Sequence, residues 1–400
     1  MSVFTRLPLV PGDPILGMTD KFNADPDPRK ANLGVGVYLG EDGKVPLMAA
    51  VAAVEKDIPA LGAAHPYLPM SGSPDLTKAI QELVFGANSE ALQAGRVASL
   101  QTLAGTGALR IGAGLLALTS ADATVMMSDP TWENHESIFG RAGFKLGHYR
   151  YYNPELRGID FAGLLEDLGN AASGSIVLLH ACCHNPTGYD LTPAQWDEVV
   201  TICVARELVP FLDMAYQGFS VGIREDAAGI EKFANSGLPF LVANSFSKTF
   251  GLYGERVGGI SYVTTDADEA ERVMSQAKMV VRSIYSNPPT YGAKIVSTIL
   301  ATPELKALWE QELYGYRDRI KAMRSALRSG LEAAGVPGDF SYITSQAGMF
   351  SYSGLDVEQM QRLRSQFHVY GLDSGRMCMA GLNTRNIDWV VGAIASVIEG

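Results

Sequence analysis

A lysine with two serines and an arginine close to it is the part of this sequence best suited to chemistry. Ser245, Ser247, Lys248 and Arg256 follow directly on the apolar run 240–243. Such a run is typical of a strand buried in a parallel sheet, and open α/β sheets bind ligands where these strands end. Hydroxyls and a guanidinium can bind phosphate oxygens, the guanidinium by two parallel charge-assisted contacts. For this stretch alone, a solvated lysine and arginine in a polar loop stays open as the alternative.

A carboxylate ends another apolar run of the sequence. Asp213 follows residues 209–212 and would be costly to bury unless it met a cation. A protonated pyridine nitrogen would be such a cation, and a lysine beside a phosphate seat is what binds the same ring covalently as a Schiff base. Lys248 and Asp213 therefore indicate pyridoxal phosphate as a cofactor.

Other predicted strands also end in residues that could hold a flat, phosphorylated ligand. The glycine-rich stretch 103–108 opens a helix, so free amides near Gly105 and Thr106 favour a phosphate, although a plain tight turn gives the same pattern. Trp132 can stack on a planar ring, and His135 can orient a neighbouring group. A core tryptophan and a satisfied surface histidine are the alternatives for these two residues.

The stretch 180–188 combines possible metal ligands with a possible hydrogen-bond donor. His180 and His184 lie near two cysteines, but no second Cys/His cluster completes a zinc site, so we expect no metal. Asn185 precedes Pro186, which restricts it to an extended conformation and leaves its amide free to donate to a ring oxygen.

The elements that would position these residues alternate between strand and helix. Strands are expected at 97–101, 124–127, 145–150, 176–180, 209–212, 240–244 and 258–263, and their continuous apolar character suits a mostly parallel sheet buried on both faces. Helices are expected at 47–61, at 74–85, after Leu191, where Thr192 and Gln195 form a capping box, and from 302 to about 334. The last would run about 50 Å, enough to bridge two domains. Residues 340–400 give an α+β pattern.

Composition and charge limit the possible partners. The 400 residues carry a net charge of −11, which argues against nucleic acid or an anionic membrane as a partner. No apolar run approaches the roughly 20 residues that span a bilayer, and the first residues lack the apolar core of a signal peptide. The four cysteines show no metal spacing, which favours buried, reduced thiols. We therefore expect a cytoplasmic protein without membrane or nucleic-acid partners.

The motifs become specific when they are taken together. They are Asn185-Pro186-Thr187-Gly188, Asp213-Met214-Ala215-Tyr216, Ser245-Phe246-Ser247-Lys248 and Arg256. In order and spacing they resemble the aspartate/aromatic (tyrosine) amino acid aminotransferases, class I, of the fold-type I pyridoxal-phosphate enzymes. The match runs from residues 32–38 to residues 374–376, which is nearly the whole chain.

The resemblance implies an α/β fold of fold-type I, with a mostly parallel seven-stranded sheet in a large domain and a smaller α+β domain. It implies an N-terminal arm at 1–12, a small domain formed by 13–44 and 313–400, and a large cofactor-binding domain at 45–312. It also implies a homodimer whose two active sites are shared between the subunits.

For the cofactor, the resemblance implies that Lys248, Asp213 and Tyr216 are catalytic. Lys248 would hold pyridoxal phosphate and move a proton between substrate and cofactor. Asp213 would pair with the ring nitrogen, with His135 behind it, and Tyr216 would bond the ring's phenolic oxygen. The phosphate would be bound by a group of residues that includes one from the second subunit: Gly105, Thr106, Ser245, Ser247, Arg256 and, across the interface, Tyr67.

For the substrate, the resemblance implies two arginines. Arg376 would bind the α-carboxylate with Gly36 nearby, and Arg282 would cross the dimer interface to meet the substrate's side chain. Trp132 and Asn185 would contact cofactor and substrate alike, Trp132 by stacking on the ring and Asn185 by bonding its phenolic oxygen. Cys378 stands where the family usually has an asparagine.

The apolar residues Leu39, Val45 and Pro66 occupy places where aspartate-preferring relatives tend to be polar. They favour an aromatic substrate, tyrosine or phenylalanine, alongside aspartate, with 2-oxoglutarate as the amino acceptor in a ping-pong reaction. Thr106 and Asn287 look more like the aspartate type, so aspartate as the main substrate is the alternative.

Three other classes of protein fit the sequence less well. A nicotinamide dehydrogenase would need the complete dinucleotide fingerprint after the first strand, which is missing. A gene regulator with a pyridoxal-phosphate domain would need a basic helix-turn-helix segment, which this acidic chain lacks. A lyase or decarboxylase of the same fold would keep Lys248 and Asp213 but need not keep both arginines.

Overall fold

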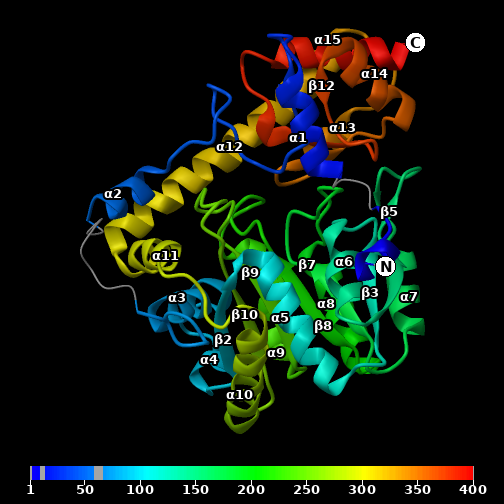
Figure 1. The fold of residues 1–400 in the computed structure, drawn as a ribbon. Helices are drawn as coiled ribbons and strands as arrows, with labels where there is room; N and C mark the ends of the chain where they lie inside the picture. Colours follow the sequence, from blue (N-terminus) through cyan, green and yellow to red (C-terminus); the bar gives the residue numbers. More distant parts are fainter. Residues whose placement is uncertain (1, 10–13, 58–65, 400) are drawn as a thin grey trace.

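The computed structural model describes residues 2–9, 14–57 and 66–399, and its core is a seven-stranded sheet (Figure 1). In spatial order the strands are β2 (Val97–Leu103), β10 (Val257–Val263), β9 (Phe240–Ser245), β8 (Val209–Met214), β7 (Ile176–His180), β3 (Thr124–Asp129) and β4 (Lys145–Arg150). Each strand lies within two residues of its expected bounds, which confirms the pattern of buried apolar runs.

One strand of this sheet runs against the others. β10 pairs antiparallel with both β2 and β9, whereas β9, β8, β7, β3 and β4 are mutually parallel. In the β9–β10 register, Ser245 pairs with Gly258 and Asn244 with Gly259. The expected mostly parallel sheet is therefore confirmed. The stretch 245–256, which contains Lys248, connects the antiparallel strands β9 and β10.

Helices cover both faces of the sheet. One face carries α5 (Ala104–Thr119), α6 (Asn134–Arg141) and α10 (Ala267–Ile284); the other carries α3 (Pro74–Phe85), α7 (Phe161–Asn170), α8 (Pro193–Ala205) and α9 (Ala228–Ser236). Successive side chains of a strand point to opposite faces, so Phe211 and Leu212 of β8 pack into different clusters. Short elements join these layers: α4 (Glu90–Gln93), β5 (Tyr152–Asn153), β6 (Gly158–Ile159) and η2 (Glu225–Ala227).

The start of α8 shows how local sequence sets an element. The Thr192 hydroxyl accepts a hydrogen bond from the Gln195 amide at 3.3 Å, and the Gln195 side chain accepts one from the Thr192 amide at 2.9 Å. This reciprocal pair is the expected capping box. Trp196 and Val199 then lie buried on the inner face of the helix.

A long helix connects the sheet to a second lobe (Figure 1). α12 (Pro303–Ala333) has 31 residues and follows α11 (Tyr291–Ala301), which packs with it against α2 (Ala49–Asp57). Toward its other end it packs against η3 (Met379–Gly381), α13 (Ser341–Ser345) and α15 (Ile387–Glu399). The expected boundary at residue 313 falls inside α12, so the division into domains stays a prediction.

The second lobe joins the two ends of the chain. β1 (Ala31–Asn32) pairs parallel with β12 (Val369–Tyr370), and β11 (Phe350–Tyr352) pairs antiparallel with β13 (Arg376–Cys378). α1 (Pro14–Ala24) and α14 (Val357–Phe367) complete the lobe. The α+β pattern expected for residues 340–400 is confirmed.

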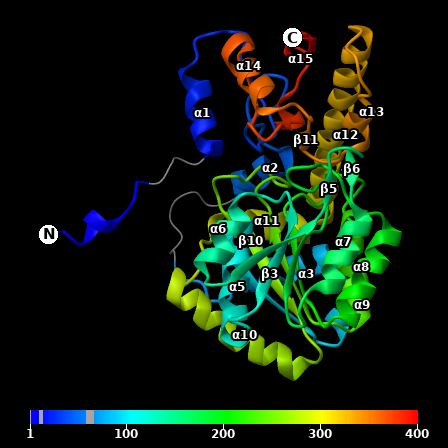
Figure 2. The same cartoon turned by 90° about the vertical axis from the view of Figure 1, so that its right-hand side faces the viewer.

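The N-terminal segment is short and exposed. η1 (Val3–Arg6) lies apart from both lobes (Figure 2), and Phe4, Leu7 and Leu9 are 70–100% exposed. The end of the helix expected at 47–61 and the end of the arm expected at 1–12 fall outside the described residues. In the part of the chain that the structure describes, no helix is long and apolar enough to cross a membrane.

Two helical glycines give a matched test of the packing. A Cβ on Gly112 of α5 would overlap the Phe211 ring, whereas a Cβ on Gly392 of α15 would meet no atom within 4 Å. Alanine gains about 1 kcal/mol in a helix, but overpacking costs about 1–3 kcal/mol. We expect Gly112→Ala to destabilise the fold and Gly392→Ala to stabilise it by about 0.5 kcal/mol or more. Urea unfolding of both variants checks this, and equal gains would contradict the packing.

Candidate active site

A cavity of about 230 Å³ lies where β7, β8 and β9 end, beside the start of α5. Parallel strands end at one edge of a sheet, so residues far apart in the sequence meet there. The cavity brings together most of the residues expected from the sequence: Gly36, Gly105, Thr106, Trp132, Asn185, Asp213, Tyr216, Ser245, Ser247, Lys248, Arg256 and Arg376.

Lys248 presents its amine to this cavity with a lowered pKa. Its Nζ lies 5.1 Å from the centre of the Tyr216 ring and donates no hydrogen bond within the described part of the chain. Burial lowers the pKa of Lys248, the charge of Asp213 raises it, and Arg256 and Arg376 lower it further, to about 8. Near neutral pH a fraction of the amine is therefore unprotonated, as a nucleophile or a base requires.

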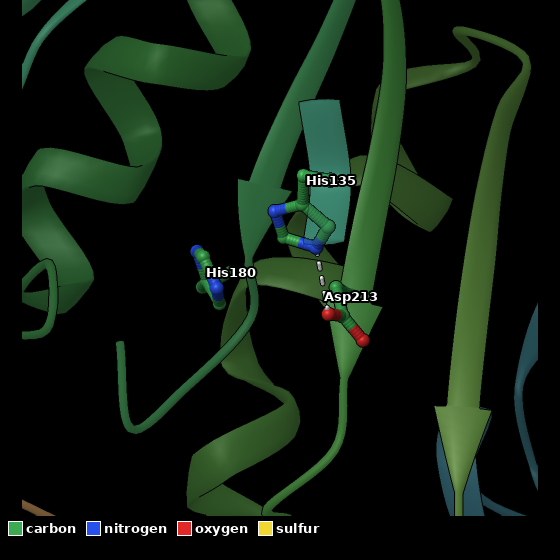
Figure 3. Close-up of side chains that lie close together, drawn as sticks. All are labelled: His135, His180 and Asp213. Atoms are coloured by element: carbon green, nitrogen blue, oxygen red, sulfur yellow. Dashed lines mark hydrogen bonds and ion pairs between the residues drawn. The ribbon is translucent and has the colours of Figure 1, made fainter. Parts of the chain in front are cut away.

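Asp213 is buried as an anion beside a histidine (Figure 3). Burial raises the pKa of Asp213, but the hydrogen bond with His135 and neighbouring charges outweigh burial and hold this pKa below its ordinary value. His135 Nε2 lies 3.2 Å from Asp213 Oδ2, and His135 Nδ1 lies 2.8 Å from Thr131 Oγ1. The histidine is thus placed behind Asp213 as expected, and the carboxylate faces the cavity ready for a cation.

Two groups of side chains have the residue types that bind metals. Potential ligand atoms of His135, His180 and Asp213 lie within 4.8 Å of one another (Figure 3), but both ring nitrogens of His135 already have partners. In the second group, Cys182, Cys183 and Asp226, the carboxylate accepts hydrogen bonds from four backbone amides of the segment 218–222. Protein groups thus already bond His135 and Asp226, one member of each group, and the expectation of no metal stays a prediction.

An anion seat lies at the side of the cavity near α5. Arg256 Nη1 donates to Ser247 Oγ at 3.3 Å, and Ser245 Oγ donates to Ser247 Oγ at 3.2 Å. α5 begins at Ala104, whose amide donates to the Arg256 carbonyl at 3.1 Å, and no side chain caps the helix, so the amides that follow in the first turn are available to an anion. Gly105 keeps this approach open, because a Cβ there would lie 3.3 Å from the Cβ of Ser245.

Arg376 comes to the cavity from the second lobe. It is 1% exposed, and it donates to Asn185 Oδ1 at 3.1 Å and to the Gly34 carbonyl at 3.0 Å. Its guanidinium lies 4.4 Å from the centre of the Phe350 ring, and its Nε has no partner among the described residues. A guanidinium that uses only two of its five N–H groups in this way keeps donors for a carboxylate. Cys378 gives it no hydrogen bond; its thiol faces the Val37 carbonyl at 3.8 Å.

Three expected site residues do not line the cavity: His135, which lies behind Asp213, and Tyr67 and Arg282. Tyr67 is 91% exposed, and Arg282, in the last turn of α10, donates to the Ser286 hydroxyl. Both were expected to act from a second subunit, which one chain does not test, so their roles stay predictions. Val45 and Pro66, expected to line the substrate site, are also exposed in this chain.

Five residues that line the cavity were not among the expected site residues: Ala104, His180, Ala215, Tyr253 and Phe350. His180 had been considered only as a metal ligand, and burial lowers its pKa to about 3. The hydroxyl of Tyr253 accepts a hydrogen bond from the Tyr38 amide at 2.9 Å. Tyr253 could have been predicted from the sequence, because it lies five residues after Lys248. No local signal in the sequence pointed to Phe350.

The family model described as "Aminotransferase class I and II" matches residues 28–394 of this sequence. The chain belongs to this family. The aminotransferase is 52% identical, over 100% of both chains, to the protein of Pseudomonas aeruginosa named aspartate aminotransferase. It is 48% identical, over 99% of this chain and 100% of the relative, to the aromatic-amino-acid aminotransferase of Escherichia coli K12.

A solved structure agrees over the whole aminotransferase chain. It is the aromatic-amino-acid aminotransferase of Burkholderia pseudomallei covalently bound to pyridoxal phosphate, with a TM-score of 0.97, 52% identity and 100% coverage of both chains. The fold type and the family expected from the sequence are therefore confirmed. The relatives carry both substrate names and favour neither.

The charges around Lys248 predict how its amine titrates in the ligand-free aminotransferase. Acylation of Lys248, followed by mass spectrometry, should reach half its maximal rate near pH 8. Asp213→Asn should move this midpoint to lower pH because Asp213 raises the pKa, and Arg256→Gln should move it to higher pH because Arg256 lowers it. A midpoint near 10.5, the ordinary lysine value, would contradict the described surroundings of the amine.

Proposed function

We propose that this aminotransferase uses pyridoxal phosphate to move the amino group of aromatic amino acids and of aspartate to 2-oxoglutarate. The observation that carries the proposal is the placement of the Lys248 amine, with its pKa of about 8, in one cavity with the Asp213 anion. The anion seat and Arg376 line the same cavity, so cofactor and substrate would be held against the same amine.

The residues present fit pyridoxal phosphate. Asp213 offers a buried anion for the ring nitrogen, and the uncapped start of α5 with Ser245, Ser247 and Arg256 offers a seat for the phosphate. Among the residues that the structure describes, the amine of Lys248 has no hydrogen-bond acceptor that it would have to give up. When bound, the cofactor supplies an aldehyde that reacts with amines and a ring that withdraws electrons from the carbon bearing the substrate's amino group.

The protein groups around the substrate have separate tasks. Lys248 can take a proton from the substrate's α-carbon and return it, because its pKa lies near the working pH. Burial raises the pKa of Tyr216 well above its ordinary value, so its hydroxyl keeps its proton and can donate a hydrogen bond. Arg376 would hold the α-carboxylate and so fix the α-carbon near the amine.

The side chain of the substrate would be read by an arginine from a second subunit. Arg282 and Tyr67 lie outside the cavity of their own chain, and exposed apolar side chains accompany them at Leu47, Ile284 and Tyr291. Exposed apolar groups of this kind are typical of an interface between subunits. We therefore propose a homodimer with shared sites. In it, Arg282 would pair with the side-chain carboxylate of aspartate, and the apolar Leu39, Val45 and Pro66 would contact an aromatic ring.

The division of the chain and its location complete the proposal. Residues 1–12 would form the arm, 13–44 with 313–400 the small domain, and 45–312 the cofactor-binding domain, with α12 crossing between the domains. The cysteines Cys182, Cys183, Cys203 and Cys378 are free and buried, which suits the reducing cytoplasm.

Lys248 gives the direct test of the proposed reaction. With phenylalanine, tyrosine and aspartate each paired with 2-oxoglutarate, the wild type should convert all three. Lys248→Ala should lose turnover by about 10²–10⁴-fold, since a general base contributes that much. It should still bind pyridoxal phosphate, but without the absorbance shift that covalent attachment gives. Retention of more than about a tenth of the wild-type rate would contradict the role of Lys248.

The two arginines should separate the substrates. Arg282→Leu should lower kcat/KM for aspartate by about tenfold to a hundredfold, because a charge-assisted hydrogen-bonded pair is lost. Phenylalanine should lose much less, since its ring has no charge for Arg282 to meet. Arg376→Leu, the matched variant, should harm both substrates alike. Equal losses for aspartate and phenylalanine in Arg282→Leu would show that this arginine does not read the side chain.

A further inference from the structure

Arg324 is a buried cation that the site described above does not use. It lies on α12, is 2% exposed and has no carboxylate within ion-pair distance in the described ranges. Its guanidinium instead donates to backbone carbonyls of a single segment: Ile343 and Gly348 at 2.9 Å each, Ala347 at 3.4 Å and Phe350.

A buried guanidinium without a counter-ion is expected to lower the stability of the fold, so stability does not explain its presence. Burial lowers the pKa of Arg324, to about 10, so the side chain is still charged near neutral pH. A buried charge without a counter-ion usually destabilises a fold relative to an apolar side chain of similar size. What the guanidinium does uniquely here is to draw several carbonyls of residues 343–350 toward one point, as its planar set of donors allows.

The segment 343–350 ends at Phe350, whose ring packs against the guanidinium of Arg376. Phe350 begins β11 and pairs with Cys378 of β13, so its side chain lies diagonal to that of Arg376 on the same face. The Arg376 guanidinium sits 4.4 Å from the centre of the Phe350 ring. Gly36 leaves room for the ring, because a Cβ at that position would lie 2.7 Å from Phe350 Cζ.

The same segment also touches the second support of Arg376. The Ala347 amide donates to the Gly188 carbonyl at 2.6 Å, and a Cβ on Gly188 would lie 2.7 Å from the Phe350 carbonyl oxygen. Gly188 ends the stretch that begins with Asn185, whose side chain accepts a hydrogen bond from Arg376. Two of the three groups that contact the Arg376 guanidinium, the Phe350 ring and Asn185, are therefore connected to the backbone that Arg324 holds, and the third is the Gly34 carbonyl.

We propose that Arg324 is a positioning residue, which sets the geometry of carboxylate binding at Arg376 through the 343–350 backbone and the Phe350 ring. The inference rests on the proposed function, in which Arg376 binds the substrate's α-carboxylate. It predicts that a change at Arg324 weakens every ligand with that carboxylate by a similar factor, whatever the ligand's side chain.

The test uses the holoenzyme and two unreactive carboxylates, succinate and 3-phenylpropionate, with binding measured by calorimetry. Arg324→Lys keeps the charge but replaces the planar fork by a single ammonium group, and Arg324→Gln keeps a planar donor without the charge. Each should raise Kd about tenfold for both probes, leave the cofactor absorbance unchanged, and raise KM more than it lowers kcat. Arg317→Lys is the matched control, since Arg317 lies on the same helix and donates to the Val221 carbonyl. It should leave Kd unchanged.

A double-mutant cycle separates positioning from general destabilisation. Phe350→Leu removes the ring but not the carbonyls, so it should weaken both probes as Arg324→Gln does, and the double variant should lose little more than either single one. Lower thermal stability with unchanged Kd, or additive losses in the double variant, would overturn the proposal. If neither Arg324 variant folds, unchanged binding in Phe350→Leu overturns it instead.

The variant Arg376→Leu distinguishes a failure of the proposed function from a failure of the positioning role of Arg324. If the wild type binds neither probe, or if Arg376→Leu binds both as tightly as the wild type, the assignment of Arg376 in the proposed function fails. If Arg376→Leu loses both probes while Arg324→Gln and Phe350→Leu keep them, only the positioning role of Arg324 fails.

Discussion

The charge of Asp213 inside the protein is the constraint on which the rest of the site depends. A buried carboxylate is stable only with partners, and His135 provides one while it is itself held by Thr131. The anion in turn raises the pKa of Lys248 against the opposing effects of burial and of two arginines. The parallel sheet makes this possible, because it ends several strands at one edge and so gathers these groups without long loops.

The second constraint is that Arg376, the arginine proposed to bind the substrate's carboxylate, comes from the other lobe. Arg376 lies on β13, near the end of the chain, while its partner Asn185 follows β7 of the central sheet. α12 spans the two lobes, and Arg319 on it donates to the Leu39 and Leu382 carbonyls and pairs with Glu41. One helix thus braces the loop near Gly36 and, through Arg324, the strand beneath Arg376. The cavity is completed only where both lobes meet.

The sequence predicted what depends on local pattern and missed what depends on contacts between distant segments. The seven strands could be located because strands buried on both faces are continuously apolar, and Lys248 and Asp213 stood out because they directly follow such strands. α2 begins at Ala49, two residues after the expected start at 47, and the division into domains stays a prediction. Phe350 and Arg324 carry no such signal, because their neighbours lie far away in the sequence. The residues expected to act across a dimer lie beyond what a single chain tests.

The antiparallel course of β10 has a consequence for how the molecule opens. Because Ser245 pairs with Gly258, the connection that carries Lys248 and Arg256 is closed at its base by the neighbouring strands β9 and β10 of the sheet. A connection closed in this way has little conformational entropy to gain unless the sheet itself unravels. The strand pairings inside the second lobe are only two and three residues long, so they can open at a lower free energy. Partial opening of the protein would then free Arg376 first and leave the loop that carries Lys248 protected from hydrogen exchange and proteolysis.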